Sequence, residues 1–339
     1  MMTYDELKEY LHCNEAETQT FLPNEIFEEL KVIENVQHRA FAYAYIYLTT
    51  YLWRYAKYGE MQYKDLTQEK LKEILGRKGD ERLNYLIKKD GVLEQLNWLE
   101  TTNNPPILYE WESDEQFLAV KKEISDWRGE VYFTLAHDWE DSAFYEDVKP
   151  PNKFTAKRPI RGTHRYPNDP EWVEEYDDGY EDGTFGYVDN THRVPIEVFL
   201  YCMTKKEVGI KGFYMYAYIY SKNQLFGGFD ATFSNLSAQL AIPEKTIERY
   251  LDIVRKFNMV IGLHNQDFFV VGMKKEQRKA NTYITNDIDL FSDEPIQYKK
   301  IKVLKRQEYL KMLEDEKKKK EEEDIEKYGI TLTLDQLPY

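Results

Sequence analysis

Residues 233–260, FSNLSAQLAIPEKTIERYLDIVRKFNMV, decide the fold of this chain. Ser234 or Asn235 can cap a first helix, because a short polar side chain accepts hydrogen bonds from the free amides at a helix start. Ile242 and Pro243 predict a turn, since Pro favours the first position of a helix and disfavours helical backbone at the residue before it. A second helix then begins. The two helices share an interior of apolar residues at helical spacing: Leu236, Leu240, Ile247, Leu251 and Val254.

The segments on either side complete an order of elements. Residues 212–225, GFYMYAYIYSKNQL, predict a long aromatic helix, and residues 259–273, MVIGLHNQDFFVVGM, predict two strands around a polar turn. A support helix, a helix-turn-helix pair and a hairpin are the parts of a winged helix, a fold that places its second paired helix in the major groove of DNA. We therefore expect a winged helix within residues 194–281.

The second helix of the pair predicts how this domain binds. Lys245 and Arg249 lie one turn apart in its N-terminal half, where recognition helices meet base edges. Arg can donate two hydrogen bonds to guanine, and Lys245 is as well suited to a phosphate. Glu244 and Glu248 on the same face favour the alternative, a domain that binds only protein. The residues expected at DNA are Lys245, Thr246, Arg249 and Lys256 of the helix and His264, Asn265 and Gln266 at the hairpin tip.

The pentapeptide YAYIY occurs twice, at Tyr43–Tyr47 and at Tyr216–Tyr220. Each copy lies in a long aromatic helix, and a helix-turn-helix pattern and two strand patterns follow. The matching order predicts a tandem pair of similar domains. In the first copy a recognition helix should begin near Gly79, and two strands should flank a polar turn at residues 101–106. Dimerisation or structural support is the alternative role for this copy. Its expected DNA contacts are Arg77, Lys78, Arg82, Lys88 and Lys89.

These patterns predict an α+β fold, mostly helical, with two winged helix-turn-helix domains in tandem, a charged linker and a helical C-terminal tail. The expected boundaries are an acidic helical segment at 1–36, a first winged-helix domain with an extension at 37–136, a flexible charged linker at 137–193, a second winged-helix domain at 194–281, and a polar arm with a charged helix at 282–339. Within the linker, residues 157–162 (KRPIRG) resemble a basic arm for the minor groove, with a solvated linker as the alternative. The helix at 297–328 is a candidate for homodimerisation, although its apolar seam is short.

Charge is distributed unevenly along the chain. The net charge of −15 argues against a simple nucleic-acid coat protein. Residues 194–281 nevertheless hold 12 Lys and Arg against eight Asp and Glu. DNA affinity depends on the local field, so a basic domain inside an acidic chain is compatible with double-stranded DNA as the partner.

The order of the predicted helices and strands and the sequence of the helix pair resemble those of a known class of protein. The run LSAQLAIPEKTIERYLDIVRKFNMV behind an aromatic helix is similar to helix-turn-helix segments of bacterial and phage regulators, and the tandem arrangement resembles plasmid and phage replication initiators of Gram-positive bacteria. That resemblance implies sequence-specific binding to repeated, AT-rich origin DNA and recruitment of host replication proteins. A winged-helix transcriptional regulator of a mobile element and a protein-binding adaptor are the alternatives.

A short segment after the second domain suggests one such partner. Ile288, Asp289, Leu290 and Phe291 are similar to the pentapeptide by which bacterial replication proteins dock on the sliding clamp. Asp287 stands where that peptide has Gln, which makes specific hydrogen bonds. A short apolar anchor in an extended arm is a sound docking peptide. The alternative is a segment that folds back on the domain.

The sequence gives little support for catalysis or membrane binding. It contains two cysteines, Cys13 and Cys202, and its six His show no ligand spacing, so we expect no metal and no cofactor. It lacks a phosphate-cradling glycine loop, and we expect a binding protein instead of an enzyme. The acidic start MMTYDELKEY is unlike a signal peptide, and no stretch approaches about 18 apolar residues. These features predict a cytoplasmic protein that does not bind membranes.

Overall fold

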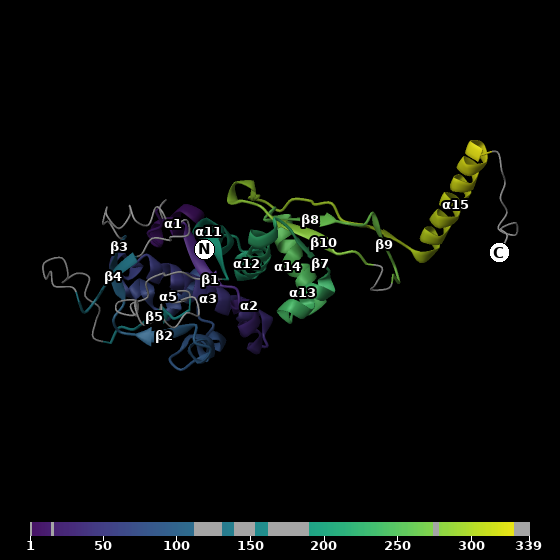
Figure 1. The fold of residues 1–339 in the computed structure, drawn as a ribbon. Helices are drawn as coiled ribbons and strands as arrows, with labels where there is room; N and C mark the ends of the chain where they lie inside the picture. The colour runs from purple at the N-terminus through teal and green to yellow at the C-terminus, as the bar shows by residue number, and fades with distance from the viewer. Residues whose placement is uncertain are drawn as a thin grey trace, which may run out of the picture.

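The structure is a computed structural model that describes residues 2–14, 17–111, 131–138, 153–161, 190–273 and 278–328. Over these residues the protein is α+β, as the sequence predicts, with many helices and small sheets of two or three strands. None of the helices in these ranges is both long and apolar enough to cross a bilayer. Figure 1 shows an elongated arrangement in which the first half lies at one end and the C-terminal helix projects at the other.

The first half surrounds one long helix. Its helices are α1 (Tyr4–Tyr10), α2 (Ile26–Glu29), α3 (Val36–Arg54), α4 (Lys57–Glu60), α5 (Gln68–Ile74), α6 (Asn84–Ile87) and α7 (Val92–Gln95), with the 3-10 turns η1 (Leu30–Val32), η2 (Tyr63–Leu66) and η3 (Glu81–Leu83). Its strands are β1 (Gln19–Pro23), β2 (Leu99–Thr102), β3 (Pro106–Trp111), β4 (Val131–Leu135) and β5 (Ala156–Pro159).

The second half contains the helix pair predicted within residues 233–260. Its helices are α11 (Ile196–Thr204), α12 (Gly209–Phe226), α13 (Phe233–Leu240), α14 (Glu244–Lys256) and α15 (Arg306–Tyr328), with the 3-10 turn η6 (Ile288–Leu290). Its strands are β6 (Thr191–Pro195), β7 (Phe229–Ala231), β8 (Val260–His264), β9 (Phe268–Val270), β10 (Asn281–Thr285) and β11 (Lys302–Leu304).

The two YAYIY helices, α3 and α12, pack against each other. Asn35 caps α3 by accepting hydrogen bonds from amides in its first turn, and buried residues surround the whole helix. A helix that is buried on all sides belongs in a core. The rings of Tyr43 and Tyr47 meet Phe213 of α12 at centroid distances of 5.6 and 4.9 Å. The two halves therefore share one hydrophobic core.

The strands that precede these helices pair reciprocally. When the two YAYIY copies are aligned, Thr20 matches Arg193 and Phe21 matches Val194. In the antiparallel pair β1–β6, Thr20 lies opposite Val194. Phe21 lies opposite Arg193 in the same pair. If each residue is replaced by its match in the other half, the first of these two pairs becomes the second. An approximate two-fold axis between the halves produces this relation. The pairing supports a duplicated unit, and it adds a strand to the N-terminal segment that the sequence predicts as helical.

In the second half, α12, α13 and α14 pack beside a three-stranded antiparallel sheet of order β7-β10-β8. The predicted helix pair is present, and α14 begins directly after Pro243. The predicted caps Ser234 and Asn235 are wrong. Thr232 has the extended backbone of a cap, and its hydroxyl accepts from the amide of Asn235, so the helix begins earlier than expected.

The strand pairing after α14 differs from the predicted hairpin. β8 pairs with β10, and His264 lies opposite Asn281. β9 pairs in parallel with β11 instead of with β8. The connection between the paired strands β8 and β10 is therefore a long excursion and not a short polar turn.

The first half departs further from its expected copy. A long recognition helix near Gly79 is wrong, because the chain there forms η3, α6 and α7 in succession. Gly91 separates α6 from α7, and a Cβ on it would lie 2.8 Å from the carbonyl oxygens of Leu86 and Lys88. The predicted pairing of the strands around residues 101–106 is also wrong. β2 pairs with β5, and β3 pairs with β4.

Residues 153–161 fall inside the predicted linker, and here they pack against the first half. Lys157 of β5 is buried, and its ammonium lies 2.6 Å from Glu94. Arg161 donates to the carbonyl oxygen of Leu96 at 2.9 Å and lies over the Trp98 ring at 4.9 Å. These contacts occupy two cations of the supposed minor-groove arm, so that resemblance does not hold in the folded chain.

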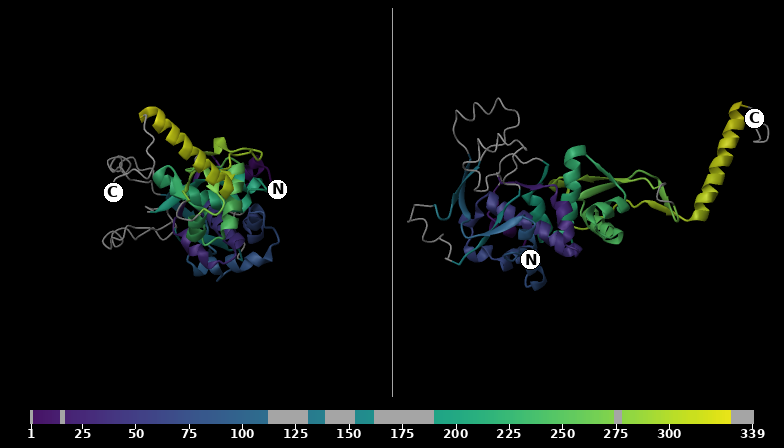
Figure 2. Two further views of the ribbon diagram at one scale, coloured as in Figure 1. Left: turned by 90° about the vertical axis from the view of Figure 1, so that its right-hand side faces the viewer. Right: turned by 60° about the horizontal axis from the view of Figure 1, so that its bottom comes forward.

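The charged C-terminal helix is shorter than predicted. It begins at Arg306, after β11, and not at residue 297. Near its start the Tyr309 ring meets Phe268 of β9 at 5.5 Å, and beyond this contact α15 projects away from the second half (Figure 2). Its role in homodimerisation stays a prediction.

Candidate nucleic-acid interface

α14 has one buried side and one exposed side. Its buried residues, at the spacing of an amphipathic helix, are Ile247, Tyr250, Leu251 and Val254. Lys245 and Arg249 are exposed one turn apart, and Thr246 between them is half-buried. Within the part of the chain that the structure describes, neither cation forms an ion pair. Both remain available to a negatively charged partner.

Two of the three acidic residues of α14 lie toward Tyr298, whereas Glu244 is exposed beside Lys245. Asp252 accepts a hydrogen bond from the Tyr298 hydroxyl at 2.6 Å and pairs with Lys256 at 2.7 Å. Burial raises the pKa of Tyr298 to about 12, and the carboxylates of Asp252 and Glu248 raise it as well. Glu248 therefore lies on the Tyr298 side. Because Lys256 has an acidic partner, it is less available to DNA than the sequence predicts.

A second group of charges surrounds Arg249, and the sequence reasoning missed one of its members. Lys211 is half-buried in the first turn of α12; burial lowers its pKa, and the charges of Arg77 and Arg249 lower it further. Arg77 belongs to the first half. None of these three side chains forms an ion pair in the described ranges, and the charge of Arg77 also contributes to lowering the pKa of the Asp80 carboxyl, which pairs with Arg82. We call Arg77, Lys211 and Arg249 the basic seam. The sequence marks Lys211 by one feature that could have drawn attention to it, since it is a single cation at the start of an aromatic helix.

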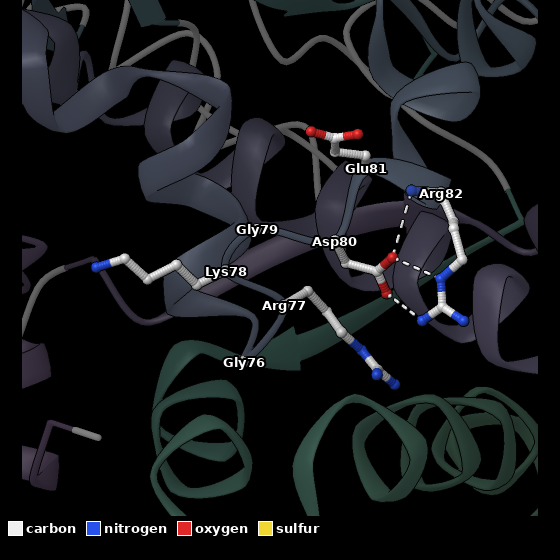
Figure 3. A pocket seen from close by; sticks show the side chains of 7 residues that line it. All are labelled: Gly76, Arg77, Lys78, Gly79, Asp80, Glu81 and Arg82. Atoms are coloured by element: carbon white, nitrogen blue, oxygen red, sulfur yellow. Dashed lines mark hydrogen bonds and ion pairs between the residues drawn. The ribbon is translucent and has the colours of Figure 1, made fainter.

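The loop at residues 76–82 directs Arg77 toward the second half. Gly76 and Gly79 have φ values of +65° and +70°, which glycine adopts without steric cost, so the chain turns sharply. Figure 3 shows Arg77 extending toward helical ribbons of the second half, whereas Lys78 points away from them. The loop encloses a shallow hollow of about 510 Å³.

Arg39 connects the first half to the turn before α14. It lies near the start of α3, and only 2% of it is exposed. Its guanidinium donates to the carbonyl oxygens of Leu240 and Ala241 at the end of α13, and to that of Ile33 at 2.9 Å. Carbonyls at a helix end carry partial negative charge, which suits a cation. The first half thereby holds the turn from which α14 begins.

The other cations predicted for the first half lie on separate elements. Lys78 pairs with a carboxylate of α5 at 2.9 Å. Arg82, in η3, pairs with Asp80 at 2.8 Å. Lys88 and Lys89 are exposed in the turn between α6 and α7. These four residues therefore occupy loops and a 3-10 turn instead of one exposed helix face.

The residues predicted at the hairpin tip lie at the base of the excursion between β8 and β10. Nδ1 of His264 lies 3.0 Å from the amide oxygen of Asn281. Asn265 donates to, and Gln266 accepts from, backbone groups of residues 279–280 at 2.9 and 3.0 Å. These side chains hold the two sides of the excursion together, so their placement at an exposed tip is wrong.

The segment with similarity to a clamp-docking peptide folds back on the second half. The Phe291 ring meets Tyr201 and Tyr216 edge-on, at centroid distances of 5.0 and 5.6 Å. Ile288 also packs against the core, whereas Leu290 is 57% exposed. This arrangement corresponds to the fold-back alternative. In this conformation the two apolar anchors are already occupied.

No group of three His, Cys, Asp or Glu side chains that could hold a metal ion is found among the described residues. Comparisons with protein-family models, curated protein sequences and solved structures found no match for this chain. Its own residues and contacts are thus the basis for a functional assignment.

Proposed function

We propose that this chain is a cytoplasmic protein that binds double-stranded DNA in a sequence-specific way, with α14 as its recognition helix. The observation that carries the proposal is the division of the α14 surface. Lys245 and Arg249 are exposed without an acidic partner in the described part of the chain, whereas Asp252 is engaged by Tyr298. Arg is suited to guanine edges and Lys to phosphates. Asp252 is therefore engaged by other side chains and does not pair with Lys245 or Arg249. Glu244, in contrast, stays exposed beside Lys245.

The order of elements supports a winged helix in the second half. α12, β7, α13, α14, β8 and β10 follow one another, and the strands form a sheet of order β7-β10-β8. Three helices closed by a small antiparallel sheet suit a helix-turn-helix protein with a wing. In the first half, α3, α5 and the β2–β5 pair support a diverged copy in which short turns replace the recognition helix. We propose that the two units form a tandem.

Within this class the proposed role is replication initiation of a plasmid or phage. Such a protein would bind AT-rich repeats in double-stranded origin DNA and recruit host replication proteins. A duplicated unit with one shared core supports this role, because a rigid tandem presents two surfaces to repeated DNA at a fixed spacing. A transcriptional regulator would use the same α14 surface. The location of the bound sites separates the two roles, since an initiator binds origin repeats and a regulator binds its promoter.

Footprinting of the full chain on DNA that carries its own gene region tests the proposal. We expect protected sites whose affinity falls steeply with salt, because bound cations displace counterions from DNA. Lys245→Ala and Arg249→Ala should each weaken specific binding by about tenfold or more. Lys311→Ala, an exposed cation on α15, is the matched control and should bind as wild type. Absence of protection at moderate salt, or wild-type binding by both α14 variants, would overturn the proposal.

A further inference from the structure

Lys211 is held at the junction of α12 and α14. The next residue, Gly212, packs against α14, since a Cβ on it would be in van der Waals contact with a methyl group of Ile253 at 3.5 Å. This contact places the first turn of α12 against the recognition helix. Lys211 is half-buried there, and its ammonium has no ion-pair partner among the described residues. The position of the cation is therefore set by the packing of two helices.

Arg77 reaches the same region from the first half. It lines a pocket of about 110 Å³ with Asn35 and His38 at the start of α3. Arg39, the next residue of α3, donates to Leu240 at the turn before α14. The start of α3 thus lies between the loop that carries Arg77 and the turn that begins α14. Figure 3 shows the Arg77 side chain directed toward the second half.

The charges of the basic seam act on one another. Arg77 and Arg249 both lower the pKa of Lys211, and both lower the pKa of Tyr250 against the effect of its burial. Like charges that converge raise the energy of the protein alone, and the Asp80 carboxylate, which already pairs with Arg82, offsets part of the charge of Arg77. A phosphate oxygen accepts hydrogen bonds from several such cations at once and removes this repulsion. The unbalanced charge is thus matched to an anion.

We propose that Arg77 and Lys211 of the basic seam bind one phosphate group of the DNA backbone between the two halves. The first half then contributes to DNA binding through Arg77, although it lacks a recognition helix. The inference rests on the proposed function, because the phosphate belongs to the duplex that α14 contacts. Phosphate contacts set the register of a protein on DNA and carry no base information. Arg77 and Lys211 therefore anchor the duplex, while Arg249, the third member of the seam, and Lys245 read it.

Neutral variants of the seam test this inference in the full chain. Arg77→Gln and Lys211→Gln should weaken specific and non-specific duplex binding by the same factor. The double variant, which loses both side chains of the shared contact, should reduce the slope of log affinity against log salt by about 0.9, the value for one phosphate contact. The affinity advantage of the wild type over the double variant should then be about threefold larger at 50 mM salt than at 200 mM. Each single variant should show a part of this reduction, because the remaining cation still contacts the phosphate.

Two matched controls lie beside the seam. Lys78→Gln removes a cation from the same loop, but Lys78 points away and pairs with α5. Lys222→Gln removes a cation from the same helix as Lys211, near the Tyr218 ring. Both should keep the wild-type slope. Lys211→Arg retains the charge and should restore most of the affinity, which separates loss of the contact from loss of folding.

The outcomes distinguish this inference from the function on which it rests. Wild-type protein that binds no duplex would overturn both proposals. If the wild type binds a duplex but Arg77→Gln and Lys211→Gln show the same salt slope as Lys78→Gln, the phosphate contact at the seam is overturned and the DNA-binding proposal is not. A loss confined to the specific site would also contradict the seam, since a backbone contact is independent of sequence.

Discussion

Replacement of Arg39 by Met should remove the connection between α3 and the turn before α14. The buried guanidinium donates to the carbonyl oxygens of Ile33, Leu240 and Ala241. Met fills much of the same volume but donates nothing. A buried acceptor without a partner costs about 1 kcal/mol at the low end, so the two fully buried acceptors, the carbonyl oxygens of Ile33 and Leu240, predict a loss of about 2 kcal/mol in the free energy of unfolding. For a chain of this size that corresponds to a fall in Tm of about 3 °C.

Thermal unfolding followed by circular dichroism measures this loss. Gln37→Met is the matched control, since Gln37 is an exposed neighbour in the first turn of α3. Arg39→Lys keeps the charge but has a single donor group, and its Tm should lie between those of wild type and Arg39→Met. Hydrogen exchange at residues 240–244 should accelerate in Arg39→Met, because the turn loses its anchor. A Tm equal to that of the Gln37→Met control would refute the reasoning.

Three further perturbations test other parts of the structure. Burial lowers the pKa of His192 to about 3, so its imidazole stays neutral in the folded protein down to about that pH. In an unfolded chain the same imidazole takes up a proton below about pH 6.5. Between pH 6.5 and pH 3, the free energy of unfolding of the wild type should therefore fall by up to about 1.4 kcal/mol per pH unit more than that of His192→Gln. Urea unfolding at a series of pH values measures this, and an equal pH dependence of the two proteins would contradict it. Phe291→Ala should destabilise the second half by about 2 kcal/mol and expose residues 287–293 to protease; unchanged cleavage would argue against the folded-back segment. Gly59→Ala should destabilise the first half by about 2 kcal/mol, because its Cβ would lie 2.0 Å from the carbonyl oxygen of Ile107, and a wild-type Tm would contradict that packing.

The helix pair in residues 233–256 was predictable because its signals are local. Pro243 marks the start of the second helix, and the apolar spacing that follows has the period of a helix. The same reasoning gave the exposed positions of Lys245 and Arg249 correctly. The sequence did not show that Asp252 is engaged while Lys245 and Arg249 are free of ion pairs within the described residues, because the partner of Asp252 is Tyr298, far along the chain.

The failures of the sequence argument share a physical cause. Strand patterns do not reveal their partners, so the pairing of β9 with β11 and of β2 with β5 was hidden. The periodicity after Gly79 continues past Gly91, yet the close approach of backbone carbonyls at Gly91 divides the segment. Lys211 could be counted as a charge, but its neighbours Arg77 and Arg249 are set by packing between the halves.

The central claim is that α14 reads the sequence of a DNA duplex. The most direct measurement is the ratio of affinities for a protected site and for an unrelated duplex of equal length, at one salt concentration, for wild type and Arg249→Ala. We predict that the wild type prefers the protected site and that Arg249→Ala loses about tenfold or more of this preference while it keeps some non-specific affinity. A wild-type ratio near one, or an unchanged ratio in Arg249→Ala, would contradict the account.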